Sequence, residues 1–192
     1  NGSASIGYEG DFGQVRVNYT RWQDEHNFLL PNGKGLGQRL TNQILQGEAD
    51  FDLDKQNTLR TTFTYVNNLR QSAKGGTTRA DMADRDDRAH LEVLRELYSG
   101  RVVLQHQALG PIEGQIGTEA RITHQTTRGL NEPLVPGTDV LNIGAFFYEE
   151  AAFGPLTLSL GGRFDYQELD AAANEALNLP ADGEGSDVLD QY

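Results

Sequence analysis

Apolar and polar residues alternate along this chain over long stretches. From Leu156 to Gln167, every even-numbered position is apolar or glycine, and every odd-numbered position is polar or glycine. Successive side chains of a β-strand point to opposite faces, so this pattern predicts a strand with one apolar and one polar face. A helix would mix the two sets of residues.

Other segments repeat the alternation. It is clear at residues 14–19, 45–53, 59–65 and 112–123, weaker at 97–108 and 139–151, and a stub at 3–9 is expected to precede them. We therefore predict about eight strands. Several stretches keep the pattern for ten or more residues, whereas a globular strand has about 5–6 and a tilted membrane-spanning strand needs about 9–11. This length favours strands that cross a membrane.

The connections between these segments alternate in length. Short turns rich in Gly, Asn, Asp and Pro are predicted at residues 10–13, 54–57, 109–112 and 152–155. Long polar loops are predicted at residues 24–38, 71–96, 126–138 and from 170 onward. Short turns on one side and long loops on the other are typical of an outer-membrane barrel.

Aromatic residues are predicted at the strand ends, where the girdles of a membrane barrel lie. Three stand before long loops and three beside short turns: Trp22, Tyr65 and Tyr166, and Phe12, Phe51 and Phe153.

Composition narrows the choice of class. Only 37% of the residues are hydrophobic and the mean hydropathy is -0.55, which leaves a lean core for a soluble domain. No run approaches the ~18 apolar residues of a membrane helix, so helical spanning is excluded and spanning by strands stays open. The net charge of -12 repels phosphate backbones, and we expect no nucleic-acid partner. The absence of cysteine excludes disulfides and thiolate metal sites.

The sequence suggests no cofactor, metal or catalytic site. The histidines His26, His90, His106 and His124 lack metal-ligand spacing. The acidic group Asp81, Asp84, Asp86 and Asp87 lacks the order of a calcium loop, and we interpret it, like residues 182–187, as a solvated loop. The glycine-rich stretch around Lys34 fails the phosphate-loop order, and no nucleophile elbow occurs.

Charged residues of both signs are expected to share the polar face, where they can pair across strands. They are Glu48, Asp50, Asp52, Glu113, Glu119 and Asp165, with Arg16, Arg60, Arg101, Arg121 and Arg163. A lumen lined with both signs explains them more simply than a pair of glycosidase carboxylates. We expect no enzyme.

Four stretches resemble barrel strands of TonB-dependent outer-membrane receptors: residues 12–22, 100–117, 145–150 and 154–166. The resemblance implies a barrel of about 22 strands closed by a plug. About eight strands are too few for that barrel, and no segment resembles a plug or a TonB contact. Residues 1–192 are therefore interpreted as a partial outer-membrane β-barrel domain, all-β and antiparallel, without a plug domain. The first residues, Asn1 to Ser5, resemble neither a signal peptide nor a chain start, so we expect a processed chain or an excerpt.

The resemblance also implies a function: uptake of a scarce nutrient, such as an iron–siderophore complex, at the bacterial outer membrane. The implied partners are the lipid bilayer, a TonB-type energising protein reached through parts absent from this chain, and a metal chelate or other small-molecule cargo. By their position in the predicted loops, Trp22, His26, Phe28 and Arg128 are the candidate cargo-binding residues.

Two alternatives remain open at this point. A soluble lipocalin-like barrel would bind a small ligand and bury its apolar residues inward. A self-contained eight-stranded membrane barrel would serve adhesion or structure. The membrane interpretations instead expect Leu156, Leu158, Leu160 and Ile116 to point outward.

Overall fold

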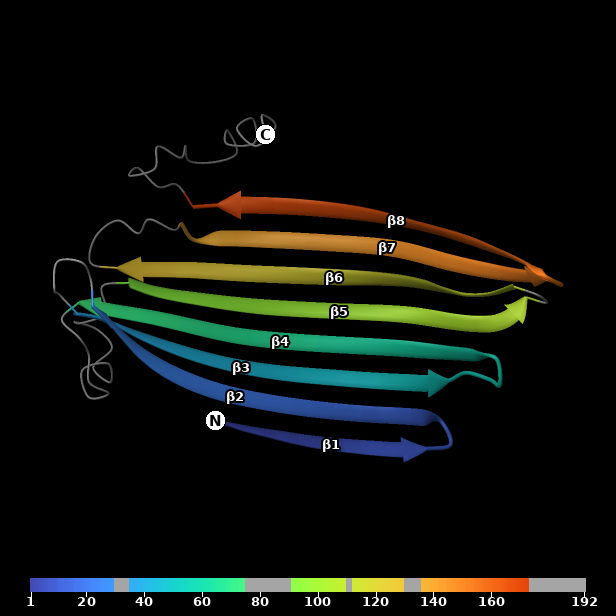
Figure 1. The fold of residues 1–192 in the computed structure, drawn as a ribbon, viewed down its shortest axis with the longest axis horizontal. Coiled ribbons are helices and arrows are strands. Elements are labelled where there is room, and N and C mark those ends of the chain that lie inside the picture. Colours follow the sequence, from blue (N-terminus) through green and yellow to red (C-terminus); the bar gives the residue numbers. More distant parts are fainter. Residues whose placement is uncertain (30–34, 75–90, 110–111, 130–135, 173–192) are drawn as a thin grey trace, which may run out of the picture.

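A computed structural model of the chain describes residues 1–29, 35–74, 91–109, 112–129 and 136–172. These residues form a single antiparallel sheet of eight strands in sequence order, and no helix occurs among them (Figure 1). The strands are β1 (Gly2–Gly10), β2 (Gly13–Leu29), β3 (Gly35–Asp52), β4 (Asn57–Lys74), β5 (Leu91–Leu109), β6 (Ile112–Gly129), β7 (Thr138–Phe153) and β8 (Leu156–Ala171). The all-β, up-and-down fold predicted from the alternation is confirmed.

Three of the four short turns lie where the sequence predicts them, and residues 110–111 of the fourth fall outside the described residues. Two residues connect β1 to β2 and two connect β7 to β8, and each hairpin uses a glycine with positive φ, Gly13 at 122° and Gly154 at 61°. In the turn from β3 to β4, the Asp54 carboxylate accepts hydrogen bonds from the backbone N–H groups of Gln56 (2.7 Å) and Asn57 (2.9 Å). It also accepts one from the Asn57 side-chain amide (2.7 Å). These hydrogen bonds hold the pKa of Asp54 below its usual value, and the bond from the Asn57 side-chain amide has the largest effect.

The opposite ends of the strands differ from the sequence prediction. Residues 24–29 continue β2, 71–74 continue β4, 91–96 begin β5 and 126–129 continue β6, where loops were expected. These extensions carry polar residues on both faces, so the alternation fades while the backbone ladder continues. The predicted long loops are therefore shorter than expected at each of these ends.

The hairpins are staggered along the sheet. In register, Gly13 pairs with Phe51, and the same row continues through Leu59, Leu104, Ile116 and Phe147 to Gly162. The last pair of the β7–β8 hairpin is formed by Leu156, six positions before Gly162. A stagger of one residue per strand, at about 3.3 Å per residue and 4.8 Å between strands, corresponds to a tilt of about 35°. Barrel strands tilt by about 35–45°.

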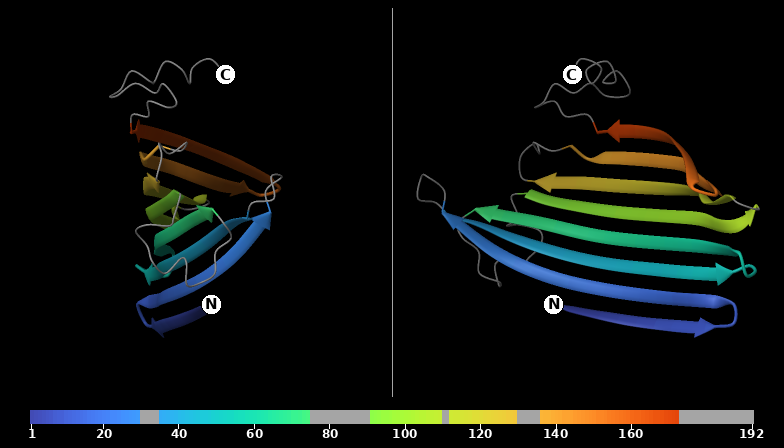
Figure 2. Two further views of the ribbon diagram at one scale, coloured as in Figure 1. Left: turned by 90° about the vertical axis from the view of Figure 1, so that its left-hand side faces the viewer. Right: turned by 45° about the vertical axis from the view of Figure 1, so that its right-hand side comes forward.

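The sheet is curved and open (Figure 2). Pairing runs from β1 to β8 in chain order, and β1 and β8 form its two edges. Such a sheet fits part of a β-barrel. No helix in the described residues is long and apolar enough to cross a membrane.

Candidate functional site

The register gathers apolar side chains on one face of the sheet, here called the apolar band. It consists of Ala4, Ile6 and Tyr8 on β1; Val15, Val17 and Tyr19 on β2; Leu45, Ala49 and Phe51 on β3; Leu59, Phe63 and Tyr65 on β4; Tyr98, Val102 and Leu104 on β5; Ile116, Ala120 and Ile122 on β6; Leu141, Ile143, Ala145 and Phe147 on β7; and Leu156, Leu158, Leu160, Phe164 and Tyr166 on β8. Glycine and threonine occupy the positions between them on each strand, and the charged residues Glu149 and Glu168 lie at the ends of the band on this face, in the register rows of Leu160 and Leu141.

The apolar band is exposed. Leu158 is 54% exposed, Ile116 53% and Phe63 47%. Within the described residues, Val103 is the single buried hydrophobic residue. Four of the five buried residues other than glycine in the described part of the chain, Asn42, Ser72, Val103 and Thr123, lie on the opposite, polar face. A sheet without a core, carrying a continuous apolar face, needs something else to cover that face.

Tyrosines border the apolar band on the side of the long connections. Tyr19, Tyr65 and Tyr98 lie in one register row, and the Tyr65 and Tyr98 rings are in contact, with centroids 4.9 Å apart. The Tyr19 hydroxyl donates to Gln43 Oε1 (3.1 Å) and that of Tyr65 to Glu96 Oε1 (2.9 Å). Each ring thus lies against the band while its hydroxyl reaches the next, polar row, as aromatic residues do at a membrane interface.

Tyr166 forms the same border on β8. Its hydroxyl donates to Glu168 Oε2 at 3.1 Å. At the turn side, Phe12 stacks with both Tyr8 and Phe51, with centroids 5.8 and 6.2 Å apart. The sequence prediction missed Tyr19 and Tyr98 in these borders, because only the register between strands aligns them. It was wrong about Trp22, which pairs with Asn42 on the polar face.

The polar face carries charged pairs beneath the middle of the band. Arg60 donates to both Asp50 carboxylate oxygens, from Nε at 2.7 Å and Nη2 at 3.2 Å, and Gln14 donates to the same carboxylate at 2.9 Å. This bidentate pairing confirms the predicted cross-strand matching of opposite charges.

A second charged group spans β6 to β8. The Arg163 guanidinium donates to Asp165 on its own strand (2.7 Å from Nε) and to Glu119 two strands away. Gly144 lies between Glu119 and Asp165 in the register, and a Cβ there would lie 2.8 Å from Asp165 Oδ1 and 2.9 Å from Arg163 Nη2. Glycine therefore allows the pair to close over β7.

Replacing Gly144 tests this arrangement. Gly144→Val is expected to separate Arg163 from Glu119 and lower the midpoint of thermal unfolding, because the added methyl groups occupy the space that the ion pair uses. Gly47→Val is the matched control, since a Cβ at Gly47 meets nothing within 4 Å. Far-UV circular dichroism measures the midpoint of thermal unfolding of both variants. Equal midpoints would contradict the role given to Gly144.

Phe146 lies between two arginines of the polar face. Its ring centroid is 4.7 Å from Arg101 Cζ and 5.9 Å from Arg163 Cζ, within the range of cation–π attraction. Arg101, Arg121 and Arg163 line one hollow with Glu119 and Asp165. The hollow offers guanidinium donors to a polar molecule that passes along this face.

An aliphatic row crosses the polar face nearer the long connections. It consists of Ile44, Val66, Leu97, Val140 and Leu169. Thr123 lies in the same row and is 7% exposed. The polar face thus has a charged zone and, on the side of the long connections, an apolar row.

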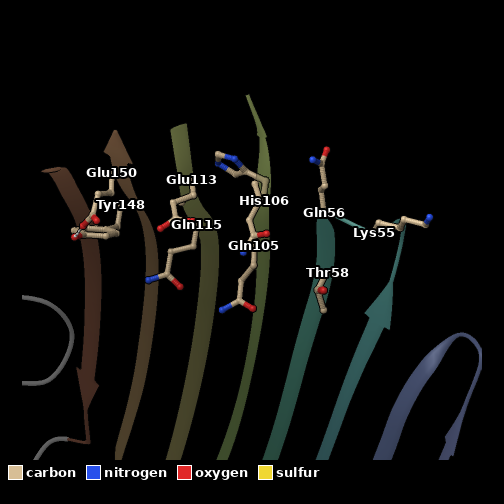
Figure 3. A pocket seen from close by; sticks show the side chains of 11 residues that line it. Lys55, Gln56, Thr58, Gln105, His106, Glu113, Gln115, Tyr148 and Glu150 are labelled. Atoms are coloured by element: carbon tan, nitrogen blue, oxygen red, sulfur yellow. Dashed lines mark hydrogen bonds between the residues drawn. The ribbon is translucent and has the colours of Figure 1, made fainter. Parts of the chain in front are cut away.

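Near the short turns, the polar face holds a hollow of about 410 Å³ (Figure 3). Thr58, Gln105, Gln115 and Tyr148 form one register row of its lining. Glu150 accepts hydrogen bonds from Tyr148 Oη (2.9 Å) and from a serine of β8 (3.2 Å). The amides and carboxylates suit hydrogen bonding with water or a polar ligand.

The four residues predicted to bind cargo lie in strands and not in loops. Trp22, His26 and Phe28 belong to β2, and Arg128 belongs to β6. His26 Nε2 is 3.0 Å from Asp24 Oδ2. Trp22 and His26 share the polar face, whereas Arg128, paired in register with Glu92, belongs to the opposite face. The structure does not bring Arg128 together with the other residues.

Several other sequence predictions fall outside the described residues: those for Lys34, His90, residues 81–87 and residues 182–187. In the described part, no three His, Cys, Asp or Glu side chains gather where they could hold a metal ion. His124 Nδ1 is 2.6 Å from Asp139 Oδ1, an isolated pair with both side chains at least half exposed.

No family model matches the chain, and neither a curated protein nor a solved structure matches it.

Proposed function

We propose that this sheet is part of the wall of a bacterial outer-membrane β-barrel, with the apolar band in the hydrocarbon and the polar face toward the lumen. The observation that carries the proposal is the exposed apolar band, bordered by tyrosines, on a sheet that has no core of its own. On β8 the band covers residues 156–166, about 33 Å along the strand. At a tilt of about 35° this is roughly 27 Å of membrane, close to the ~25 Å apolar belt of such barrels. The band narrows to residues 15–19 on β2.

A soluble ligand-binding barrel fits these observations poorly. It would turn Phe63, Ile116 and Leu158 inward, whereas these side chains are about half exposed. They belong to a contiguous apolar face that runs across all eight strands, and soluble monomers rarely expose large contiguous apolar patches. A self-contained eight-stranded membrane barrel requires β1 to pair with β8, and these strands form separate edges. We propose that further strands of a larger barrel cover both edges.

Within this proposal, the function is uptake of a scarce nutrient, such as an iron chelate, energised by a TonB-type protein. Its support is the resemblance of the strands to TonB-dependent receptors, together with two features of the sheet. The strands of 17–19 residues from β2 to β6 exceed the ~9–11 needed to span, so their ends stand beyond the band as a polar wall. The polar face carries both charged groups and an aliphatic row, which suits contact with a plug and a mixed polar cargo.

Uptake by a deletion strain tests the function. Loss of the full-length chain is expected to abolish accumulation of one radiolabelled ferric chelate from a panel, and the plasmid-borne chain should restore it. Restoration should fail in a host that lacks the TonB-type energising protein. Recovery of the chain in the soluble fraction, or uptake that does not depend on energisation, would contradict the proposal.

A further inference from the structure

We infer that the apolar face of β5–β8 binds a single zwitterionic phospholipid whose headgroup carries a primary ammonium. The inference rests on the membrane location proposed above. It begins from a close pair of titratable side chains on the turn side of the apolar band: His106 Nε2 lies 3.1 Å from Glu149 Oε1. His106 comes from β5 and Glu149 from β7, with Gly114 of β6 between them in the register.

Gly114 makes the pair possible. A Cβ at this position would lie 2.3 Å from the Tyr148 carbonyl oxygen and 2.4 Å from Glu149 Oε2. Backbone of the neighbouring strand cannot yield that much space, so a side chain here would displace Glu149. The two polar side chains therefore meet over a position kept open by glycine.

Each member of the pair has a polar atom left over. His106 Nδ1 and Glu149 Oε2 are buried and have no hydrogen-bond partner among the described residues. The His106 side chain is 12% exposed and that of Glu149 31%. Buried polar atoms are rarely left without partners, because the lost hydration costs about 1–3 kcal/mol for each. The pair therefore suits a ligand that brings an acceptor and a donor.

The surroundings of the pair are apolar toward the middle of the band. In the register row that holds it, the other positions are Asn57, Gly114 and Leu160, without a further charge. The next row contains Leu104 and Phe147. A headgroup at the pair would thus lie where the apolar band ends on β5, β6 and β7, with Leu160 of β8 in the same row and Leu158 and Leu156 continuing the band toward the turn.

A groove for an acyl chain begins at this point. It has a volume of about 750 Å³ and is lined by Leu104, Ile116, Ala145, Phe147, Gly162 and Phe164, among others. These residues belong to the two rows next to the His106–Glu149 pair. Ala145 is the small side chain of this lining, and the Phe147 ring lies over Gly162. The polar pair lies nearer the interface and the apolar groove nearer the membrane centre. A phospholipid places its headgroup and its acyl chain in the same order.

The chemistry of the pair selects the headgroup. Ionised Glu149 only accepts hydrogen bonds, so Oε2 fits an ammonium N–H. When the imidazole is protonated, both ring nitrogens donate: Nε2 to Glu149 and Nδ1 to a phosphate oxygen. With the imidazole protonated, the pair and a phosphatidylethanolamine headgroup are each neutral overall, so binding leaves no net charge there. Phosphatidylcholine has no ammonium N–H and phosphatidylglycerol has no ammonium, and both should bind more weakly.

Lipid retention by the full-length chain tests the inference. The protein would be placed in nanodiscs with equal parts of phosphatidylethanolamine, phosphatidylcholine and phosphatidylglycerol, and the lipids retained after release would be identified by native mass spectrometry. We expect phosphatidylethanolamine to be retained about tenfold over the others, since hydrogen bonds to charged groups are the stronger class. Glu149→Gln and His106→Gln should each remove most of this preference.

Two further variants separate headgroup from groove and from general damage. Glu113→Gln, on the polar face at a similar height, should keep the preference. Ala145→Trp should fill the groove and lower retention of every phospholipid while the pair remains. Equal retention of the three lipids by an inserted, folded chain, or an unchanged preference in Glu149→Gln, would overturn the lipid site alone. A chain that does not enter nanodiscs would overturn the membrane proposal as well.

Discussion

Ile116→Arg is expected to destabilise the bilayer-inserted protein by about 1–3 kcal/mol, between the cost of an arginine at the midplane and at the interface, because Ile116 is the turn-side residue of the apolar band on β6. Ile116 lies within the apolar band, between Leu104 and Phe147 in the register, and is 53% exposed. In water, an exposed isoleucine could be replaced by arginine at little cost. The effect therefore depends on hydrocarbon being in contact with this position.

The matched control is the next residue along β6. Gln115 lies on the polar face between Gln105 and Tyr148, and Gln115→Arg is expected to change stability by less than about 1 kcal/mol. Both values come from denaturant unfolding of the protein refolded in lipid vesicles. Equal destabilisation by the two variants, or a larger effect at Gln115, would contradict the assignment of the faces.

Gly13→Ala is expected to have the other large effect. Gly13 has φ 122°, and a Cβ there would lie 1.9 Å from the carbonyl oxygen of Asp50. Such a backbone conformation costs an L-residue about 1–3 kcal/mol, and overpacking adds a similar amount, so a loss of about 3–5 kcal/mol is expected. The change would disturb the start of β2 and its pairing with β3.

Gly154→Ala is the control for Gly13→Ala. Gly154 also has positive φ, 61°, in a two-residue turn, but a Cβ there meets nothing within 4 Å. Gly154→Ala should lower the free energy of unfolding by about 1–2 kcal/mol, the cost of the left-handed conformation alone. The same unfolding experiment in vesicles measures both. Indistinguishable stabilities for the two variants would contradict the close approach of Gly13 to Asp50.

The parts of the fold that sequence predicted well are those where one face is apolar and the other polar. The alternation from Leu156 to Gln167 predicts β8, and the Gly-Pro and Asp-Asn residues predict the short turns, because both signals are local. Beyond the tyrosine border polar and apolar residues occur on both faces, and the alternation disappears. Residues such as His26 and Arg128 were therefore assigned to loops, although backbone pairing continues through them.

The candidate sites required information that alternation does not contain. His106 lies on the apolar face, and its partner Glu149 comes from two strands away. The same holds for Glu119 and Arg163, which meet across Gly144. Register between strands decides such contacts, and it is set by turn geometry and by the whole sheet. Only the register shows that a glycine such as Gly144 lies between two interacting polar side chains.

The direction of the apolar face is tested most directly by a spin-label scan of β6. The chain has no cysteine, so a single cysteine can be placed and labelled in vesicles at each position from Ile112 to Thr123, except at Gly114 and Gly117, where a side chain has no room. Our account predicts that oxygen reaches the even-numbered positions best and a water-soluble nickel chelate reaches the odd-numbered ones best, out of phase with a period of two residues. Even-numbered positions shielded from both reagents, as in a dry protein interior, would contradict it.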